Sequence, residues 1–88
     1  MEKMTEILVV EDSFTQALLI QAVLEEADYR VGLAKNGLEA LKYLKGRKPD
    51  LVVSDIIMPE MDGYEMCRHI KGDDTLKHIP VMLLTSLS

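Results

Sequence analysis

Acidic and hydroxyl side chains follow three apolar runs of the sequence. They are Glu11, Asp12 and Ser13 after the first run, Ser54 and Asp55 after a later one, and Thr85 and Ser86 after the last. Carboxylates that lie close together raise one another's pKa unless a cation compensates their charge. Mg²⁺ suits a site made of a few carboxylates and several waters. The acidic residues Glu11, Asp12 and Asp55 are therefore candidate ligands of a Mg²⁺ ion.

Each of these residues also has an ordinary structural explanation when it is taken alone. Asp and Ser are common turn formers and helix N-caps, and Ser13 is placed to cap a helix. The prediction of a site therefore depends on the three carboxylates converging. They converge if the strands that precede them are parallel neighbours, because ligands of open α/β sheets bind beyond the carboxyl ends of the strands.

Four short apolar runs predict β-strands at residues 7–10, 31–34, 51–53 and 81–84. The segments between them predict helices at about 13–27, 38–45 and 63–71, where apolar residues recur three or four positions apart. Strict alternation of strands and helices predicts an α/β fold, a doubly wound open parallel sheet with helices on both faces. We expect the first, third and fourth strands to be buried on both faces.

Composition excludes several classes of protein. The 88 residues carry a formal net charge of −5 and are 48% hydrophobic, which is typical of one globular domain. No apolar run exceeds four residues, whereas a membrane span needs roughly 20. An acidic chain without a long basic run is a poor nucleic-acid binder. The single Cys67 cannot form an internal disulfide, which is typical of proteins in a reducing cytoplasm. The first residues also lack the long apolar region of a secretory signal peptide, so we expect a cytoplasmic protein.

Three motifs resemble the receiver domain of bacterial two-component response regulators. They are Val10-Glu11-Asp12-Ser13, the stretch from Asp55 through Met58-Pro59 to Gly63, and Leu84-Thr85-Ser86, in this order. The resemblance implies a flavodoxin-like sheet with strand order 2-1-3-4-5 for the full domain. The resemblance covers the whole chain but only about the first two-thirds of the family's domain. We therefore expect residues 1–88 to be a single receiver domain that lacks the last helix, strand and helix.

The resemblance also implies a role for each residue of the site. Asp55 would be the phosphoacceptor, which receives a phosphoryl group from a sensor histidine kinase or a histidine phosphotransfer domain. Mg²⁺ would be held by Asp12, Asp55, the backbone carbonyl of Ile57 and, through a water, Glu11. The Thr85 hydroxyl and the Ser86 backbone would bind the phosphoryl oxygens. The added charge would then shift a conformational equilibrium, which is the output signal.

Further expectations concern surfaces and rates. The family docks its partner on the face of the first helix that carries Phe14, Gln16, Ala17, Leu18 and Gln21. The lysine of the family's fifth strand is absent, so we expect a damaged active site. The apolar strand at 81–84 lacks a covering helix, so we predict a homodimer across this exposed edge. Because Ile57 and Leu87 are apolar and cannot orient a water, we predict slow loss of the phosphoryl group from an intact domain.

Alternative functions have weaker support in the residues. A receiver-like module that binds proteins without phosphorylation stays open, although the acidic residues and Thr85 argue against it. A phosphohydrolase with an Asp nucleophile would want an acid two residues after that Asp, and a dinucleotide-binding domain would need a glycine-rich loop after a strand. We interpret His69 and His78 as surface residues, Cys67 as at least partly buried, and Arg47-Lys48 as solvated loop charge.

Overall fold

The computed structural model describes residues 4–58 and 60–84, in which strands and helices alternate. The elements are β1 (Glu6–Val10), α1 (Phe14–Glu26), β2 (Arg30–Ala34), α2 (Gly37–Gly46), β3 (Leu51–Asp55), α3 (Gly63–Lys71) and β4 (Val81–Leu84). The predicted α/β class and the order of the elements are therefore confirmed. None of the described helices combines the length and the apolar content that crossing a bilayer requires.

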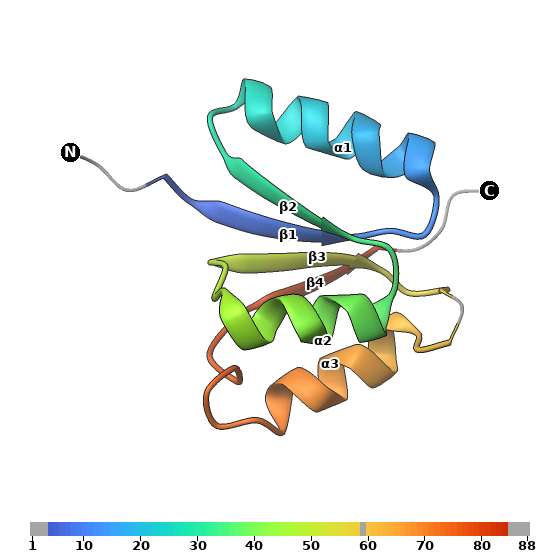
Figure 1. Cartoon of the computed structure of the whole chain (residues 1–88), viewed down its shortest axis with the longest axis vertical. Helices are drawn as coiled ribbons and strands as arrows, with labels where there is room; N and C mark the ends of the chain where they lie inside the picture. The colour runs from blue at the N-terminus through green and yellow to red at the C-terminus, as the bar shows by residue number, and fades with distance from the viewer. Residues whose placement is uncertain (1–3, 59, 85–88) are drawn as a thin grey trace.

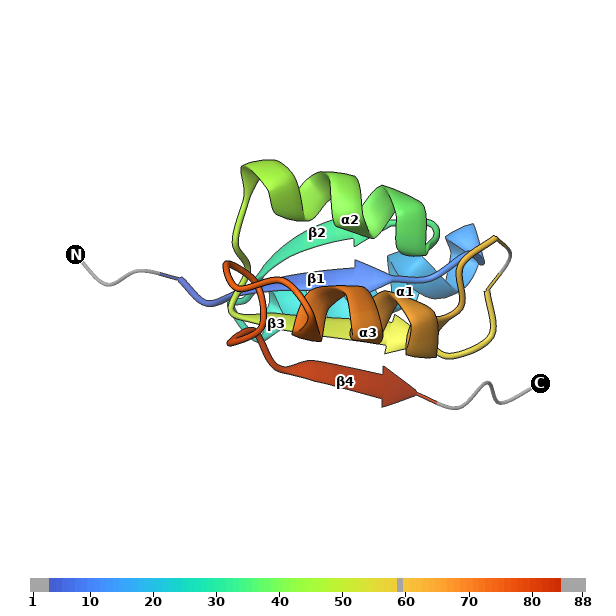
Figure 2. The same cartoon turned by 90° about the horizontal axis from the view of Figure 1, so that it is seen from below.

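The four strands form one parallel sheet of order β2-β1-β3-β4. Helix α1 covers one face of the sheet, and α2 and α3 cover the other (Figure 1). Figure 2 shows the strands side by side, with β4 at the edge. This order equals the first four strands of the expected 2-1-3-4-5 arrangement. Helices on both faces follow from the right-handed crossovers that connect parallel strands.

Short polar side chains set the start of each helix. Ser13 Oγ accepts a hydrogen bond from the Gln16 backbone N–H at 3.3 Å, so Ser13 is the N-cap of α1. Asn36 caps α2 in the same way, and Glu39 returns a hydrogen bond to the Lys35 N–H at 2.9 Å. The observed bounds of α1 and α2 each differ by one residue from the predicted 13–27 and 38–45. Helix α3 begins and ends as predicted.

The main core lies between the sheet and the pair of helices α2 and α3. Its fully buried side chains come from the central strands, from the inner faces of both helices and from the connection before β4: Leu8, Val10, Val52, Ala40, Leu44, Met66, Ile70 and Ile79. β1 is buried on both faces, as predicted, since four of its five residues are inaccessible. Burial of branched side chains at about 25 cal/mol per Å² is the main force that holds these layers together.

Strands β3 and β4 correct the expectation of burial on both faces. Val52 and Ser54 are buried, but Leu51 and Val53 on the opposite face of β3 are only half-buried. In β4, Val81 and Leu83 are half-buried, whereas Met82 and Leu84 are 52% and 39% exposed. The reason is that α1 lies over β1 and β2, so within the described residues no helix covers this face of β4. The homodimer across this edge stays a prediction.

Glu6 at the start of β1 ties the sheet to the end of α2. Its Oε2 accepts a hydrogen bond from the Tyr43 hydroxyl and lies 3.1 Å from Arg47 Nε. The Arg47 guanidinium also stands 6.0 Å from the centre of the Tyr43 ring. Arg47 lies in the loop after α2 with 54% of its side chain exposed, as expected, and it also pairs with Glu6, which lies 41 residues away in the sequence.

The same contacts shift two pKa values. The hydrogen bond from Tyr43, supported by Arg47, lowers the pKa of the Glu6 carboxyl. Burial, followed by the hydrogen bond to Glu6, raises the pKa of Tyr43 to about 12. A lowered carboxyl pKa stabilises the fold above the unfolded pKa, and this contribution is lost as the pH falls through the folded one. A raised phenol pKa stabilises the fold below the unfolded pKa, and this contribution is lost as the pH rises through about 12.

Replacing Tyr43→Phe removes one hydrogen bond to a charged and partly exposed carboxylate. We expect the free energy of unfolding to fall by about 1 kcal/mol at neutral pH. The difference between the two proteins shrinks as Glu6 becomes protonated in acid. Urea denaturation at a series of pH values measures both effects. The control is Tyr64→Phe, because Tyr64 is 53% exposed and makes no side-chain hydrogen bond within the described residues; an equal loss in that variant would contradict the assignment.

Candidate functional site

Three carboxylates converge where β1 and β3 end. Glu11 and Asp12 follow β1, and Asp55 is the last residue of β3. The two strands are parallel neighbours in which Val10 pairs with Ser54, so the next positions along them are Glu11 and Asp55. Each of the three acids has an oxygen within 4.8 Å of the other two. The predicted convergence is therefore present in the structure.

Burial and charge act together on Glu11. Removal of its carboxyl from water raises its pKa most, and the negative charges of Asp55 and Asp12 add to this effect. The Ser13 backbone N–H donates to Glu11 Oε1 at 3.1 Å, which acts in the opposite direction. Repulsion between carboxylates, the cause expected from the sequence, contributes to the raised pKa of Glu11, but burial contributes more. The cluster is thus a place where positive charge is favourable.

The donor set suits a hard divalent cation. It consists only of carboxylate oxygens, and Asp12 is exposed while Glu11 and Asp55 are half-buried. Mg²⁺ is bound in proteins by one or two carboxylates and keeps several waters, so it needs an open site of this kind. The residues present therefore fit the predicted metal.

The loop at residues 56–62 leaves the site directly after Asp55. The Ile57 backbone N–H lies 3.4 Å from Asp55 Oδ1, and the Ile57 side chain is 72% exposed. Met58 and Met61 are buried and anchor the loop to the core. The role predicted for the Ile57 carbonyl stays a prediction. Pro59, which belongs to the motif that follows Asp55, lies outside the described residues.

Gly63 contributes to the site in a way that sequence reasoning missed. We interpreted it only as the opening residue of α3. A Cβ atom at this position would lie 2.6 Å from the Asp55 carbonyl oxygen and 3.0 Å from Ile56 Cα. The start of α3 therefore approaches the end of β3 so closely that only glycine fits. The Gly63 N–H also donates to the Ile56 carbonyl at 2.8 Å, which closes the loop.

The described residues end at the position next to Asp55 on β4. Leu84 pairs with Asp55, and the Ile56 N–H donates to the Leu84 carbonyl at 3.1 Å. Thr85, Ser86 and Leu87, for which we predicted phosphoryl-binding and water-gating roles, lie outside the described residues. Their roles remain predictions.

The other described residues that we singled out are not members of the carboxylate cluster. His69 and His78 are exposed and Cys67 is half-buried, as expected. On the predicted docking face of α1, Phe14 and Leu18 are 73% and 43% exposed, but Ala17 is 5% exposed. Including Ala17 in a docking face was wrong, because its side chain points into the protein as the one buried residue of the helix.

Known proteins with similar sequences are much longer than this chain, which spans 6% and 18% of the two relatives below. The family model described as "Response regulator receiver domain" matches residues 7–88. Histidine kinase P4 of Formosa agariphila is 48% identical over 87 residues, which are 99% of this chain and 6% of that kinase. Response regulator PleD of Caulobacter vibrioides is 42% identical over 81 residues, which are 92% of this chain and 18% of PleD.

Solved receiver structures superimpose closely on the chain. The signal receiver domain of a signal transduction histidine kinase from Syntrophus aciditrophicus has a TM-score of 0.90 and 52% identity, over 96% of this chain and 64% of that one. The receiver domain of sensor histidine kinase PA1611 from Pseudomonas aeruginosa has a TM-score of 0.89 and 30% identity, over 97% and 70%. That structure holds a magnesium ion coordinated in its active-site cleft.

Fold, carboxylate cluster and sequence similarity agree. The chain belongs to the response regulator receiver domain family, whose members are phosphoacceptor modules of two-component signalling rather than conventional enzymes.

Proposed function

We propose that Asp55 accepts a phosphoryl group from a phosphohistidine in a Mg²⁺-dependent reaction, and that the chain is a signalling switch controlled by this modification. The observation that carries the proposal is the position of Asp55 at the end of β3, within 4.8 Å of two further carboxylates. A sensor histidine kinase or a histidine phosphotransfer domain is the proposed donor. Phe14 and Leu18, which are apolar and exposed, are the proposed contacts for this donor on α1.

The proposed reaction moves one phosphoryl group between two nucleophiles. A carboxylate oxygen of Asp55 attacks the phosphorus, the bond between phosphorus and the donor imidazole breaks, and the electron pair stays with the imidazole nitrogen. The product is an acyl phosphate on Asp55. Phosphoryl transfer requires the protein mainly to position the reacting groups and to neutralise their charge. Gly63 and the anchored loop at 56–62 hold the Asp55 backbone in place for the first task.

The acidic residues provide for the second task by holding the metal. Asp12 and Asp55 would ligate Mg²⁺ directly, Glu11 through a water, and Ile57 through its backbone carbonyl. When bound, Mg²⁺ supplies positive charge that offsets both the carboxylates and the phosphoryl oxygens. The Thr85 hydroxyl and the Ser86 backbone are the proposed partners of those oxygens.

Treatment with phosphoramidate, which carries a bond between phosphorus and nitrogen, tests the phosphoacceptor. We expect the protein to gain one phosphoryl group in the presence of Mg²⁺ and none in Asp55→Asn, as read by intact mass. Asp74→Asn is the matched control, because it removes an equal charge at a residue whose side chain is exposed. Folded protein that binds Mg²⁺ but gains no phosphoryl group would instead support a receiver-like binding module.

Titration calorimetry with Mg²⁺ tests the metal site separately. Asp12→Asn removes one proposed ligand, so we expect the dissociation constant to rise by about tenfold or more. Glu26→Gln on the exposed side of α1 makes the same change in charge outside the cluster and should leave the affinity unchanged. Equal weakening in both variants would mean that Mg²⁺ responds only to net charge.

The lifetime of the acyl phosphate tests the role of the side chain next to the site. Ile57 is 72% exposed and apolar, so it cannot orient a water for hydrolysis. We expect slow loss of the phosphoryl group and a faster loss in Ile57→Gln, whose amide can hold a water. Ile57→Val should behave like the original protein. Mass spectra taken over time measure the rates, and a lifetime of seconds in the original protein contradicts the prediction.

A further inference from the structure

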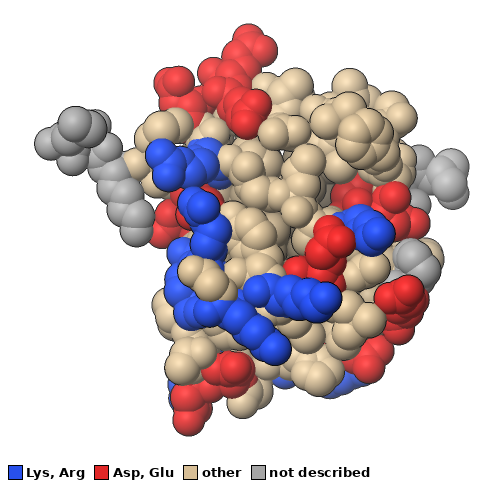
Figure 3. Space-filling view, in the orientation of Figure 1, with Lys and Arg blue, Asp and Glu red and all other residues tan. Residues whose placement is uncertain are grey.

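The charges of the chain are strongly segregated. Residues 35–48 hold five of the ten Lys and Arg side chains but one of the fifteen Asp and Glu side chains. This segment therefore carries +4, whereas the remainder carries −9. In the folded protein the basic side chains gather over α2 and its C-terminal end (Figure 3). A basic surface on an acidic protein is a feature that can select an oppositely charged partner.

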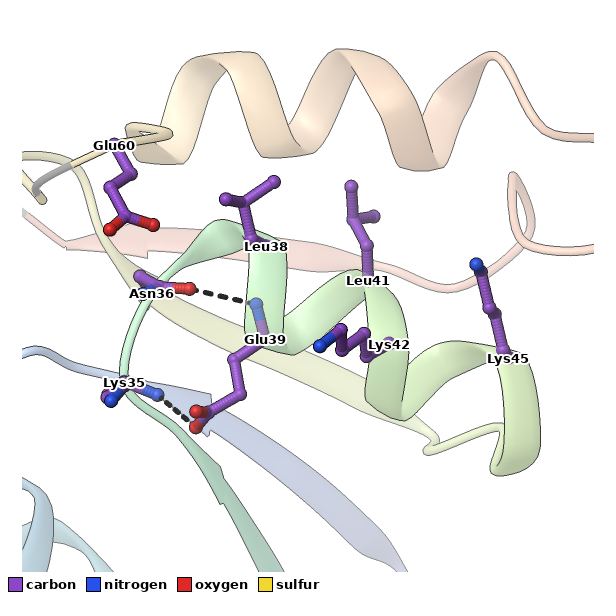
Figure 4. Close-up of a pocket in the computed structure, with 8 residues that line it drawn as sticks. All are labelled: Lys35, Asn36, Leu38, Glu39, Leu41, Lys42, Lys45 and Glu60. Carbon is purple, nitrogen blue, oxygen red and sulfur yellow. Dashed lines mark hydrogen bonds between the residues drawn. The ribbon is translucent and has the colours of Figure 1, made fainter.

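A groove of about 670 Å³ runs along α2 within this basic surface. Its lining combines three lysines with two leucines, an asparagine and two glutamates: Lys35, Lys42, Lys45, Leu38, Leu41, Asn36, Glu39 and Glu60. Figure 4 shows that Leu38, Leu41 and Lys45 extend from α2 toward α3. None of the three clustered carboxylates, Glu11, Asp12 and Asp55, lines the groove, so it is distinct from the candidate phosphoacceptor site.

The lysines of the groove are available to a partner. Among residues 4–58 and 60–84 the ion pairs are Arg47 with Glu6 and Lys77 with Asp74, so neither pair uses Lys35, Lys42 or Lys45. The negative charges lie at the other end of the groove. Glu39 accepts the Lys35 N–H at the start of α2, and Glu60 extends from the preceding loop of α3 (Figure 4). The end of the groove near Lys42 and Lys45 is therefore positive.

The leucines give the groove an apolar floor. Leu38 is 47% exposed, which is a large exposure for a leucine on a helix that packs on a core, and Leu41 is half-buried beside it. An apolar centre with a charged rim is the usual anatomy of a protein interface. Apart from Glu60, the lining residues span 35–45, which is about three helical turns of sequence.

We propose that this groove binds an acidic amphipathic segment of a partner protein. The segment places leucine-type side chains on Leu38 and Leu41, and its carboxylates near the end of the groove that carries Lys42 and Lys45. A nucleic acid fits less well, because its phosphates would meet Glu39, Glu60 and two leucines. The proposed contacts, Leu38, Leu41, Lys42 and Lys45, do not belong to the carboxylate cluster, so this proposal can be tested without phosphorylating Asp55.

Synthetic helical peptides of about 15 residues test the proposal on the whole chain. One peptide carries leucines on one face flanked by glutamates, and two others replace every glutamate with glutamine or with lysine. We expect only the acidic peptide to bind, with backbone amide shifts at residues 35–45, and its affinity to fall as ionic strength rises. Equal binding of the lysine peptide, or no binding of any peptide to the folded chain, would overturn the proposal.

Variants of the chain locate the contact. Lys42→Gln with Lys45→Gln should weaken binding of the acidic peptide by about five- to tenfold, and Leu38→Gln should weaken it independently of salt. Arg68→Gln with Lys77→Gln removes the same two charges outside the groove and should have little effect. Equal weakening in this control would show attraction to net charge only. Sedimentation that reveals a dimer lost in the Lys42 and Lys45 variant would overturn the proposal in favour of a second copy as the occupant.

Discussion

The parallel pairing of β1 with β3 is the constraint on which the site depends. The hydrogen-bond ladder of the two strands places Val10 beside Ser54 and so brings Glu11, Asp12 and Asp55 to one edge of the sheet. Burial of the branched side chains on both faces of β1 holds this register, since a shift by one residue would turn the apolar side chains of a strand to the wrong faces. The hydrophobic core thus stabilises a cluster of like charges that would otherwise separate.

The loop after Asp55 links this edge to the neighbouring helices. Gly63 lets α3 start against the end of β3, and the buried Met61 packs against Gly37, where an added Cβ would lie 2.8 Å from the Met61 side chain. The loop is therefore fixed to the first residues of both α2 and α3. A change of charge on Asp55 would act on a loop that touches the starts of two helices, which is a physical route from a modified carboxylate to the surface of the domain.

The two ends of the sheet differ in their electrostatics. At the carboxyl end, three acids lie together and the pKa of Glu11 is raised, whereas at the opposite end Glu6 is paired with Tyr43 and Arg47 and its pKa is lowered. Paired charge stabilises a fold, and unpaired charge in a cluster destabilises it until a cation binds. Repulsion between unpaired carboxylates is therefore confined to the end of the sheet where we propose that a cation binds. At the other end the carboxylate of Glu6 is paired and stabilises the fold.

The sequence by itself determined the element types, their alternation and the acidic residues that follow the strands, because periodicity, caps and composition act over a few residues. It also located all three carboxylates of the cluster. Only the tertiary structure decided the contact of Gly63 with Asp55, the pairing of Arg47 with Glu6, the exposure of Met82 and Leu84, and the groove along α2. Each of these depends on which surfaces meet when residues distant along the chain pack together, and no local pattern of residue types records that.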